Sequence, residues 1–225
     1  MGNRDAEANM MFTSGTEMTT AVTDLINGII CVFLILRMRK QWPNRVRTDL
    51  WTLMFALFAL VCFVGVIPHG LTISRELFSV FWMVLYALMA FMMSALTAAI
   101  RFEVYGPADL RRNLTVNMCV AAAGAIVLVI LSWKTSVGFV SFGAYCAANM
   151  VYIIRLLLRH LRERECLKYY LTAILLLAAG TILQMVRSIR FRVIWDFNYN
   201  SVYHFFLLLS MLVMYRGIML AQKSQ

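Results

Sequence analysis

Charged residues are scarce in this chain of 225 residues. They make up 14% of it, whereas about a quarter is usual for a soluble domain. The five cysteines include no Cys-x-x-Cys pair, and we interpret them as small packing residues. Prolines number three and no internal repeat is visible, which argues against a transporter built from matched halves. The low content of charged residues argues against an ordinary soluble domain, and 62% of the chain is hydrophobic.

Apolar residues gather in seven stretches that account for almost the whole chain. They cover residues 20–36, 50–68, 77–100, 115–132, 137–157, 169–188 and 201–220. About 20 apolar residues span a hydrocarbon layer of roughly 30 Å, and a helix satisfies its own backbone hydrogen bonds inside lipid. The sequence therefore predicts an all-α, polytopic integral membrane protein, a bundle of seven transmembrane helices.

The basic residues predict the orientation of these helices. Fifteen of the 21 Lys and Arg residues fall on one side of the predicted topology and six on the other. Because basic loops stay in the cytoplasm, we expect the N-terminus outside and the C-terminus inside. Most of the net charge of +10 is then a topology signal, and we expect no nucleic-acid partner. The loop with Arg187, Arg190 and Arg192 is the exception, because it places three arginines outside.

The chain divides into one membrane domain and two short tails. Residues 1–19 are expected to form a polar tail without a cleavable signal peptide, since they lack a basic region leading into an apolar core. Residues 20–220 form the seven-helix domain, and residues 221–225 form a short C-terminal tail. The sequence indicates neither a particular membrane nor an oligomeric state.

Polar side chains inside the apolar stretches carry the functional signal, because each costs a few kcal/mol in lipid unless it is paired. They are Asp24 and Asn27 in the first stretch, His69 at the end of the second, Gln184 and Arg187 in the sixth, and Asn200 and His204 in the seventh. The predicted topology places all seven in the outer half of the membrane. Residues three or four apart share a helix face, so each pair lies on one face.

Several of these residues also have a purely structural interpretation. Asp24 could complement the dipole at the start of the first helix, and Asn200 could cap the seventh. His69 lies in Pro-His-Gly, a common helix ending, and would then sit at headgroup level. Arg187, Arg190 and Arg192 could reach lipid phosphates. His204, a full turn inside its helix, is the residue that these interpretations explain least.

The pattern resembles the CREST superfamily of seven-helix membrane proteins, which contains the alkaline ceramidases, the adiponectin and progestin receptors and related hydrolases. The resemblance rests on Asp24-x-x-Asn27, on His69 ending the second helix and on His204 in the first turn of the seventh. It implies a zinc ion held by one His of the second helix and two of an HxxxH pair in the seventh. In this chain His69, His204 and Asn200 would be the metal ligands, with Asp24 as the catalytic candidate.

The chain departs from the pattern of that superfamily in three places. Asn200 stands where the first His of HxxxH would be, and Gly65 stands where a Ser would support the metal-bound water. In the superfamily an Asp on the third helix also supports the metal-bound water. Here the third helix has no Asp, and Glu76 at its start is the nearest acid. Two His and an Asn make a weak zinc site, although Asp24 would give a set of two His and one carboxylate. A separate seven-helix family with its own GxxxHG and NxxxH pattern is the alternative.

Three functions stay open at this point. The first is a non-catalytic binding, sensing or scaffold protein whose polar cluster is a hydrogen-bonded plug. The second is a zinc-dependent hydrolase of membrane lipid amides or esters, in which Asn27, Gln184, Arg187 and Arg190 would bind the substrate. The third is a small-solute transporter. Membrane lipids are the expected partners in the first two.

Other seven-helix classes fit less well. The last stretch has no lysine for a retinal Schiff base. The third ends without an acid-Arg-Tyr triplet, and the seventh lacks Asn-Pro-x-x-Tyr. G-protein-coupled receptors therefore share only the topology.

Overall fold

Seven long helices make up most of the part of the chain that the computed structural model describes, which is residues 13, 15–42, 45–134 and 138–223. They are α2 (Gly15–Gln41), α3 (Arg45–Gly70), α4 (Arg75–Tyr105), α5 (Leu110–Lys134), α6 (Gly138–His160), α7 (Glu165–Met185) and α8 (Tyr199–Lys223). A short 3-10 helix, η1 (Pro107–Asp109), precedes α5, and two strands, β1 (Arg190–Arg192) and β2 (Asp196–Asn198), connect α7 to α8. The predicted all-α bundle is confirmed. Every long helix has the length and composition to cross a membrane, which indicates a multi-pass membrane protein.

Two helices extend into the segments predicted as tails. α2 begins at Gly15, inside the segment predicted as a tail, and α8 continues to Lys223. The hydroxyls of Thr19 and Thr20 donate to backbone carbonyls one turn earlier, and Glu17 lies in the first turn of α2. The acid near the positive helix end supports a first turn that hydropathy alone does not reveal. The rest of the predicted N-terminal tail lies outside the described residues.

The sixth apolar stretch ends earlier than predicted. α7 stops at Met185, and the backbone then turns into β1 and β2, an antiparallel hairpin in which Phe191 pairs with Phe197. The prediction that Arg187 continues the helix face of Gln184 is therefore wrong. A strand of three residues carries too little alternation to be read from sequence.

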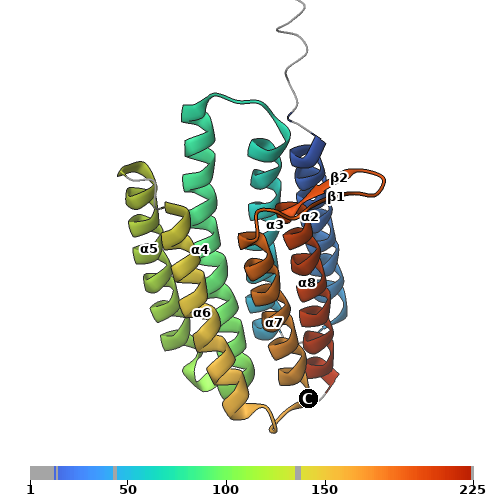
Figure 1. The fold of residues 1–225 in the computed structure, drawn as a ribbon. Coiled ribbons are helices and arrows are strands. Elements are labelled where there is room, and N and C mark those ends of the chain that lie inside the picture. Colours follow the sequence, from blue (N-terminus) through green and yellow to red (C-terminus); the bar gives the residue numbers. More distant parts are fainter. Residues whose placement is uncertain (1–12, 14, 43–44, 135–137, 224–225) are drawn as a thin grey trace, which may run out of the picture.

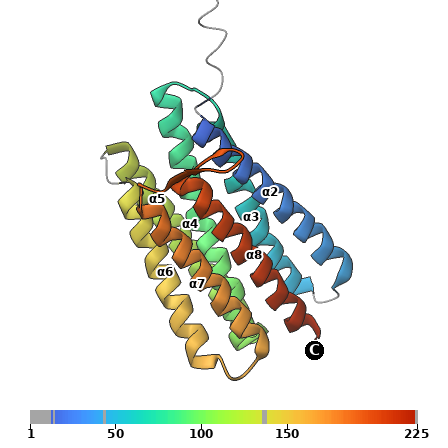
Figure 2. The ribbon, with the colours of Figure 1, turned by 45° about the vertical axis from the view of Figure 1, so that its right-hand side comes forward.

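The helices form two groups that meet along α3, α4, α6 and α7 (Figure 1). In one group α4 packs on α5 and α6, and in the other α2 packs on α3 and α8 while α8 packs on α7. The turned view in Figure 2 shows α2 and α8 side by side along much of their length. The hairpin crosses the end of the bundle at which α2 and α8 begin (Figures 1 and 2).

Small residues let the helices approach closely. A Cβ atom added at Gly180 would lie 2.6 Å from the Cβ of Phe206, and one added at Gly124 would lie 2.8 Å from the Tyr145 ring. Ala90 and Ala99 on α4 are fully buried. Close backbone approach of this kind drives helix packing where the surrounding lipid offers no hydrophobic force.

Large apolar side chains also cover the outside of the bundle. Leu36, Val140 and Ile182 are each more than 60% exposed, and they lie on three different helices. A water-soluble bundle buries most such residues. The apolar exterior therefore agrees with a surface that faces hydrocarbon.

Candidate functional site

A polar seam joins α2 to α8 at the end of the bundle where both helices begin. The hydroxyls of Thr20 and Ser201 lie 3.0 Å apart, and Thr20 also donates to Oδ1 of Asn198 at 3.2 Å. The same Asn198 oxygen accepts the backbone N–H of Ser201 at 3.0 Å. An asparagine that accepts an N–H three residues ahead stabilises the start of a helix. Asn198 therefore holds the capping position of α8 that the sequence suggested for Asn200.

His204 lies one turn further inside and both of its ring nitrogens face polar groups. Nδ1 lies 2.9 Å from the Thr23 hydroxyl, and Nε2 lies 3.4 Å from Oδ1 of Asp24. The Asn27 amide donates to the backbone carbonyl of His204 at 3.1 Å. Asp24, Asn27 and His204 are all buried. The seam therefore uses the polar residues of two apolar helices to satisfy one another, as burial in lipid requires.

His69 connects the end of α3 to the same seam. Its Nδ1 lies 2.8 Å from Oε2 of Glu17, whose other oxygen accepts from the Asn198 amide at 3.1 Å. The centroids of the His69 and His204 rings are 6.3 Å apart, with the rings nearly perpendicular. The side chain of Glu17 is one-third exposed. Asp24, Asn27, His69 and His204, which the sequence placed only at one depth, thus meet in one group, and Glu17 belongs to the same group.

Gly65 on α3 provides the space for Asp24. A Cβ atom at position 65 would lie 2.8 Å from Oδ2 of Asp24 and 3.4 Å from its Cγ. A serine at this position would collide with the carboxylate. Glycine at position 65 therefore has a steric reason in this fold.

The remaining predicted residues do not join the seam. Gln184 donates to Oδ1 of Asn200 at 3.0 Å, which connects the end of α7 to the start of α8. Within the described part of the chain, neither side chain bonds to His69 or His204. Arg187 follows the end of α7 and Arg190 lies on β1, and both are exposed. The sequence placed these four at the correct end of the bundle but could not fix the direction of their side chains.

The donor groups do not fit the predicted zinc ion. Asn200 is bonded to Gln184, and both nitrogens of His204 face Thr23 and Asp24. Among the residues that the structure describes, no group of three or more His, Cys, Asp or Glu side chains is arranged to hold a metal ion. Zinc in a catalytic site needs three protein ligands around one centre. This arrangement therefore gives no basis for a zinc-bound water.

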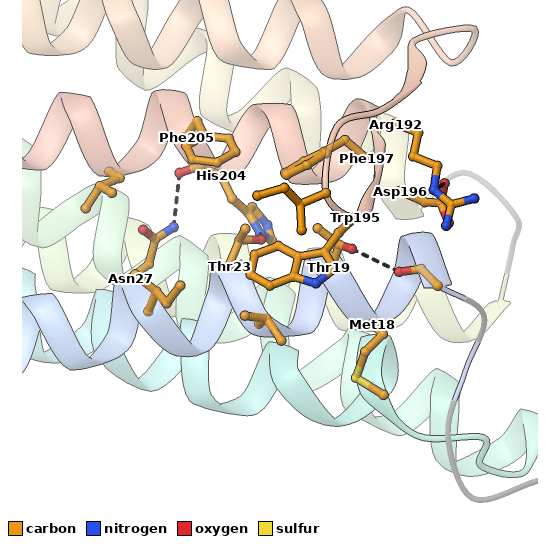
Figure 3. Close-up of a pocket in the computed structure, with 15 residues that line it drawn as sticks. Met18, Thr19, Thr23, Asn27, Arg192, Trp195, Asp196, Phe197, His204 and Phe205 are labelled. Atoms are coloured by element: carbon orange, nitrogen blue, oxygen red, sulfur yellow. Dashed lines mark hydrogen bonds and ion pairs between the residues drawn. The ribbon is translucent and has the colours of Figure 1, made fainter.

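A groove of about 430 Å³ opens beside the seam (Figure 3). One wall is α2, the other is α8, and the hairpin covers one end. Its lining residues are Gly15, Met18, Thr19, Val22, Thr23, Ile26, Asn27, Arg192, Ile194, Trp195, Asp196, Phe197, His204, Phe205 and Leu208. The lining is mostly apolar, and Thr23, Asn27 and His204 form a polar strip within it. Asp24 is not part of the lining and lies behind this strip.

The opposite end of the bundle holds a buried charged cluster that the sequence did not reveal. Nε of Arg47 donates to Oε1 of Glu103 at 2.8 Å, and the Trp51 indole donates to the same oxygen at 3.0 Å. Arg164 contacts the Glu103 backbone carbonyl at 2.7 Å and the second carboxylate oxygen at 3.5 Å. Arg47 also donates to the backbone carbonyl of Ala221 at 3.0 Å. The cluster therefore connects α3 and α4 to α8 and to the start of α7.

This cluster corrects one sequence expectation and adds one buried acid. Arg47 counted as a loop charge, but it lies inside α3 and is 1% exposed. Glu103 is a buried acid near the end of α4, also 1% exposed. The spacing of Arg47 and Trp51, one turn apart on a helix, was the available signal, because both could reach one acid on a neighbouring helix.

Comparison with known proteins gives one family. A protein-family sequence profile described as "Family of unknown function (DUF6962)" matches residues 19–223. Since the match covers most of the chain, the chain belongs to this family. No curated protein and no solved structure shows a significant match.

Proposed function

We propose that this member of the DUF6962 family is a non-catalytic membrane protein that binds an amphipathic lipid in the groove between α2, α8 and the hairpin. The observation that carries the proposal is the groove itself, which is apolar over most of its lining and has one polar strip. Ligand sites in proteins commonly enclose about 300–1,000 Å³ and combine an apolar lining with a few polar groups. A volume of about 430 Å³ lies within that range.

The groove has the two kinds of surface that an amphipathic molecule needs. Val22, Ile26 and Phe205 line it and are each partly exposed at the side of the bundle, where hydrocarbon chains would meet them. Thr23 and His204 provide polar atoms at the inner wall, and Arg192 provides a cation at the hairpin end. An acyl chain would follow the apolar wall, and a hydroxyl, amide or phosphate would lie near the polar strip and the arginine.

The proposal includes the orientation with the N-terminus outside and the C-terminus in the cytoplasm. Its support is the distribution of basic residues, which stays uneven after the buried Arg47 is taken out of the count. The groove then lies in the outer half of the membrane, next to the outer leaflet from which a lipid would enter.

A binding role agrees better with the seam than catalysis does. The carboxylate of Asp24 faces His204 and the Gly65 backbone and does not line the groove. A catalytic acid or base must come within hydrogen-bond reach of its substrate. Asp24, the catalytic candidate of the sequence, is therefore assigned a structural role in the seam.

Native mass spectrometry of the protein released from mild detergent tests this proposal. We expect wild-type protein to retain a bound amphiphile, and Ile26→Trp to lose it, because a large side chain would fill the groove. Ile29→Trp is the matched control, since Ile29 is 55% exposed on the same helix and does not line the groove. Equal retention in both variants, or none in wild type, would overturn the proposal.

A further inference from the structure

The hairpin between α7 and α8 has a rigid base and a short turn. Phe191 and Phe197 pair across the strands, with ring centroids 5.2 Å apart and ring planes nearly parallel. Phe197 also packs against Phe205 of α8, at a centroid distance of 5.9 Å. At the turn the Val193 backbone donates to the carbonyl of Trp195 at 3.2 Å. An isolated two-stranded hairpin is only marginally stable in water, so the contact with α8 fixes this one to the bundle.

The turn of the hairpin projects sideways past the wall of the bundle. Figure 1 shows the strands running across the helix ends and the turn extending beyond α2. In a chain whose helices cross a bilayer, a segment that leaves the bundle sideways at this level lies over lipid. A segment pointing along the helix axes would lie in water instead.

The turn carries three consecutive apolar side chains that are mostly exposed. Val193 is 72% exposed, Ile194 77% and Trp195 62%. Keeping three such side chains in water costs free energy roughly in proportion to their exposed area. Tryptophan in particular concentrates at membrane–water interfaces, where its ring meets apolar chains and its N–H meets water. The composition of the turn therefore matches an interface better than bulk water.

Three exposed arginines precede the apolar turn. Arg187, Arg190 and Arg192 are all exposed, and the contact of Arg192 with Asp196, at 3.7 Å, is long and open to solvent. Such an exposed pair contributes little and leaves the guanidinium able to engage another anion. One guanidinium group can bind a phosphate through two parallel N–H···O hydrogen bonds. These three charges are the ones that oppose the predicted topology, and contact with lipid phosphates gives them a role outside.

We propose that the hairpin turn inserts into the lipid–water interface on the side where α2 and α8 begin. Val193, Ile194 and Trp195 would lie below the headgroups, and Arg187, Arg190 and Arg192 would contact lipid phosphates. The inference uses only the hairpin geometry and the membrane-crossing helices. It does not depend on a ligand in the groove.

Tryptophan fluorescence of the full chain in phosphatidylcholine vesicles tests the position of the turn. The chain has five tryptophans, so the contribution of Trp195 is the difference between wild type and Trp195→Phe. We expect this difference to have blue-shifted emission, strong quenching by lipids brominated near the headgroup end of the acyl chain, and little quenching by aqueous iodide. Quenching by iodide without quenching by bromolipid would overturn the proposal and leave the turn as a water-exposed surface for a protein partner.

Two further measurements test the proposal in case Trp195→Phe perturbs the fold. Hydroxyl-radical footprinting of wild-type protein in the same vesicles needs no substitution, and we expect Trp195 to be protected. Rapid oxidation of Trp195 would contradict insertion. A variant with Arg190→Gln and Arg192→Gln should show weaker bromolipid quenching of Trp195, and unchanged quenching would refute the phosphate contacts. Ile194 and Trp195 also line the groove, so quenching and protection of Trp195 that persist when the groove lipid is lost support insertion of the turn, and their disappearance together with that lipid would contradict it.

Discussion

Replacing Glu103 with Gln should destabilise the bundle more than any comparable change at its surface. The Glu103 carboxylate is buried and contacts Arg47 at 2.8 Å, Trp51 at 3.0 Å and Arg164 at 3.5 Å. Gln keeps the shape of the side chain and an oxygen for the Trp51 indole, but it removes the negative charge. The variant therefore isolates the contribution of that charge.

The expected cost follows from the burial of the partner. Arg47 is 1% exposed, so its charge cannot return to water when Glu103 becomes neutral. Removing one partner of a buried ion pair typically costs about 3–5 kcal/mol. The Gln oxygen can still accept from Arg47, and the carbonyl of Ala221 stays as a second acceptor. We therefore expect about 3 kcal/mol, at the lower end of that range, which is roughly a hundredfold in the folded-to-unfolded ratio.

Equilibrium unfolding in mixed micelles measures this cost. Increasing fractions of SDS are added to protein in mild detergent, and helix content is followed by circular dichroism. Glu76→Gln is the matched control, because Glu76 is an exposed acid in the first turn of the same helix. We expect Glu76→Gln to unfold close to wild type and Glu103→Gln to unfold at a clearly lower SDS fraction.

The result that would refute this reasoning is an equal midpoint for the two variants. It would mean that the cluster is hydrated or rearranges when the charge is lost. Replacing both partners, with Arg47→Met and Glu103→Leu together, should recover part of the loss, because apolar residues of similar size remove both desolvation costs. A double variant less stable than Glu103→Gln would contradict the electrostatic explanation.

Two further predictions concern the polar seam, and the same SDS titration measures both. Gly65→Ala should lower the free energy of unfolding by about 1–3 kcal/mol, because the new Cβ would meet the Asp24 carboxylate at 2.8 Å. Gly143→Ala is the control, since a Cβ atom at position 143 has no neighbour within 4 Å. Adding Asp24→Ala to Gly65→Ala should relieve the clash. Equal costs at the two glycines would contradict this packing. His69→Gln should cost only about 0–1 kcal/mol, since its partner Glu17 is one-third exposed, and a loss as large as that of Glu103→Gln would show that the pair is effectively buried.

Several elements of this protein follow from local sequence. A segment in lipid must satisfy its backbone hydrogen bonds within itself, so each apolar stretch specifies a helix whatever its neighbours do. The placement of Asp24, Asn27, His69 and His204 at one end of the bundle followed in the same way, from the direction of each helix. Their actual contact, through Nε2 of His204 and Oδ1 of Asp24 at 3.4 Å, could not be predicted. It depends on the rotation of α2 and α8, which no single stretch determines.

Other features depended on where each helix begins and on contacts between neighbouring elements. Asn200 and Gln184 share a hydrogen bond with each other, and Asn198 takes the capping role. Positions differing by one or two residues on a helix point in different directions, so a small error in the helix start reassigns every role. The hairpin was missed because its strands have three residues each, and its stability comes from packing on α8.

The sequence by itself determined the number and nature of the helices and the end of the bundle at which His69 and His204 lie. These properties depend on apolar length and on backbone hydrogen bonding, which are local. Only the tertiary structure decided that Arg47 and Glu103 form a buried pair, that Gly65 makes room for Asp24, and that α2, α8 and the hairpin enclose a groove. Each of these results from side chains on different helices meeting at a distance of a few ångströms. That meeting is set by helix rotation and packing, which hydropathy and spacing do not encode.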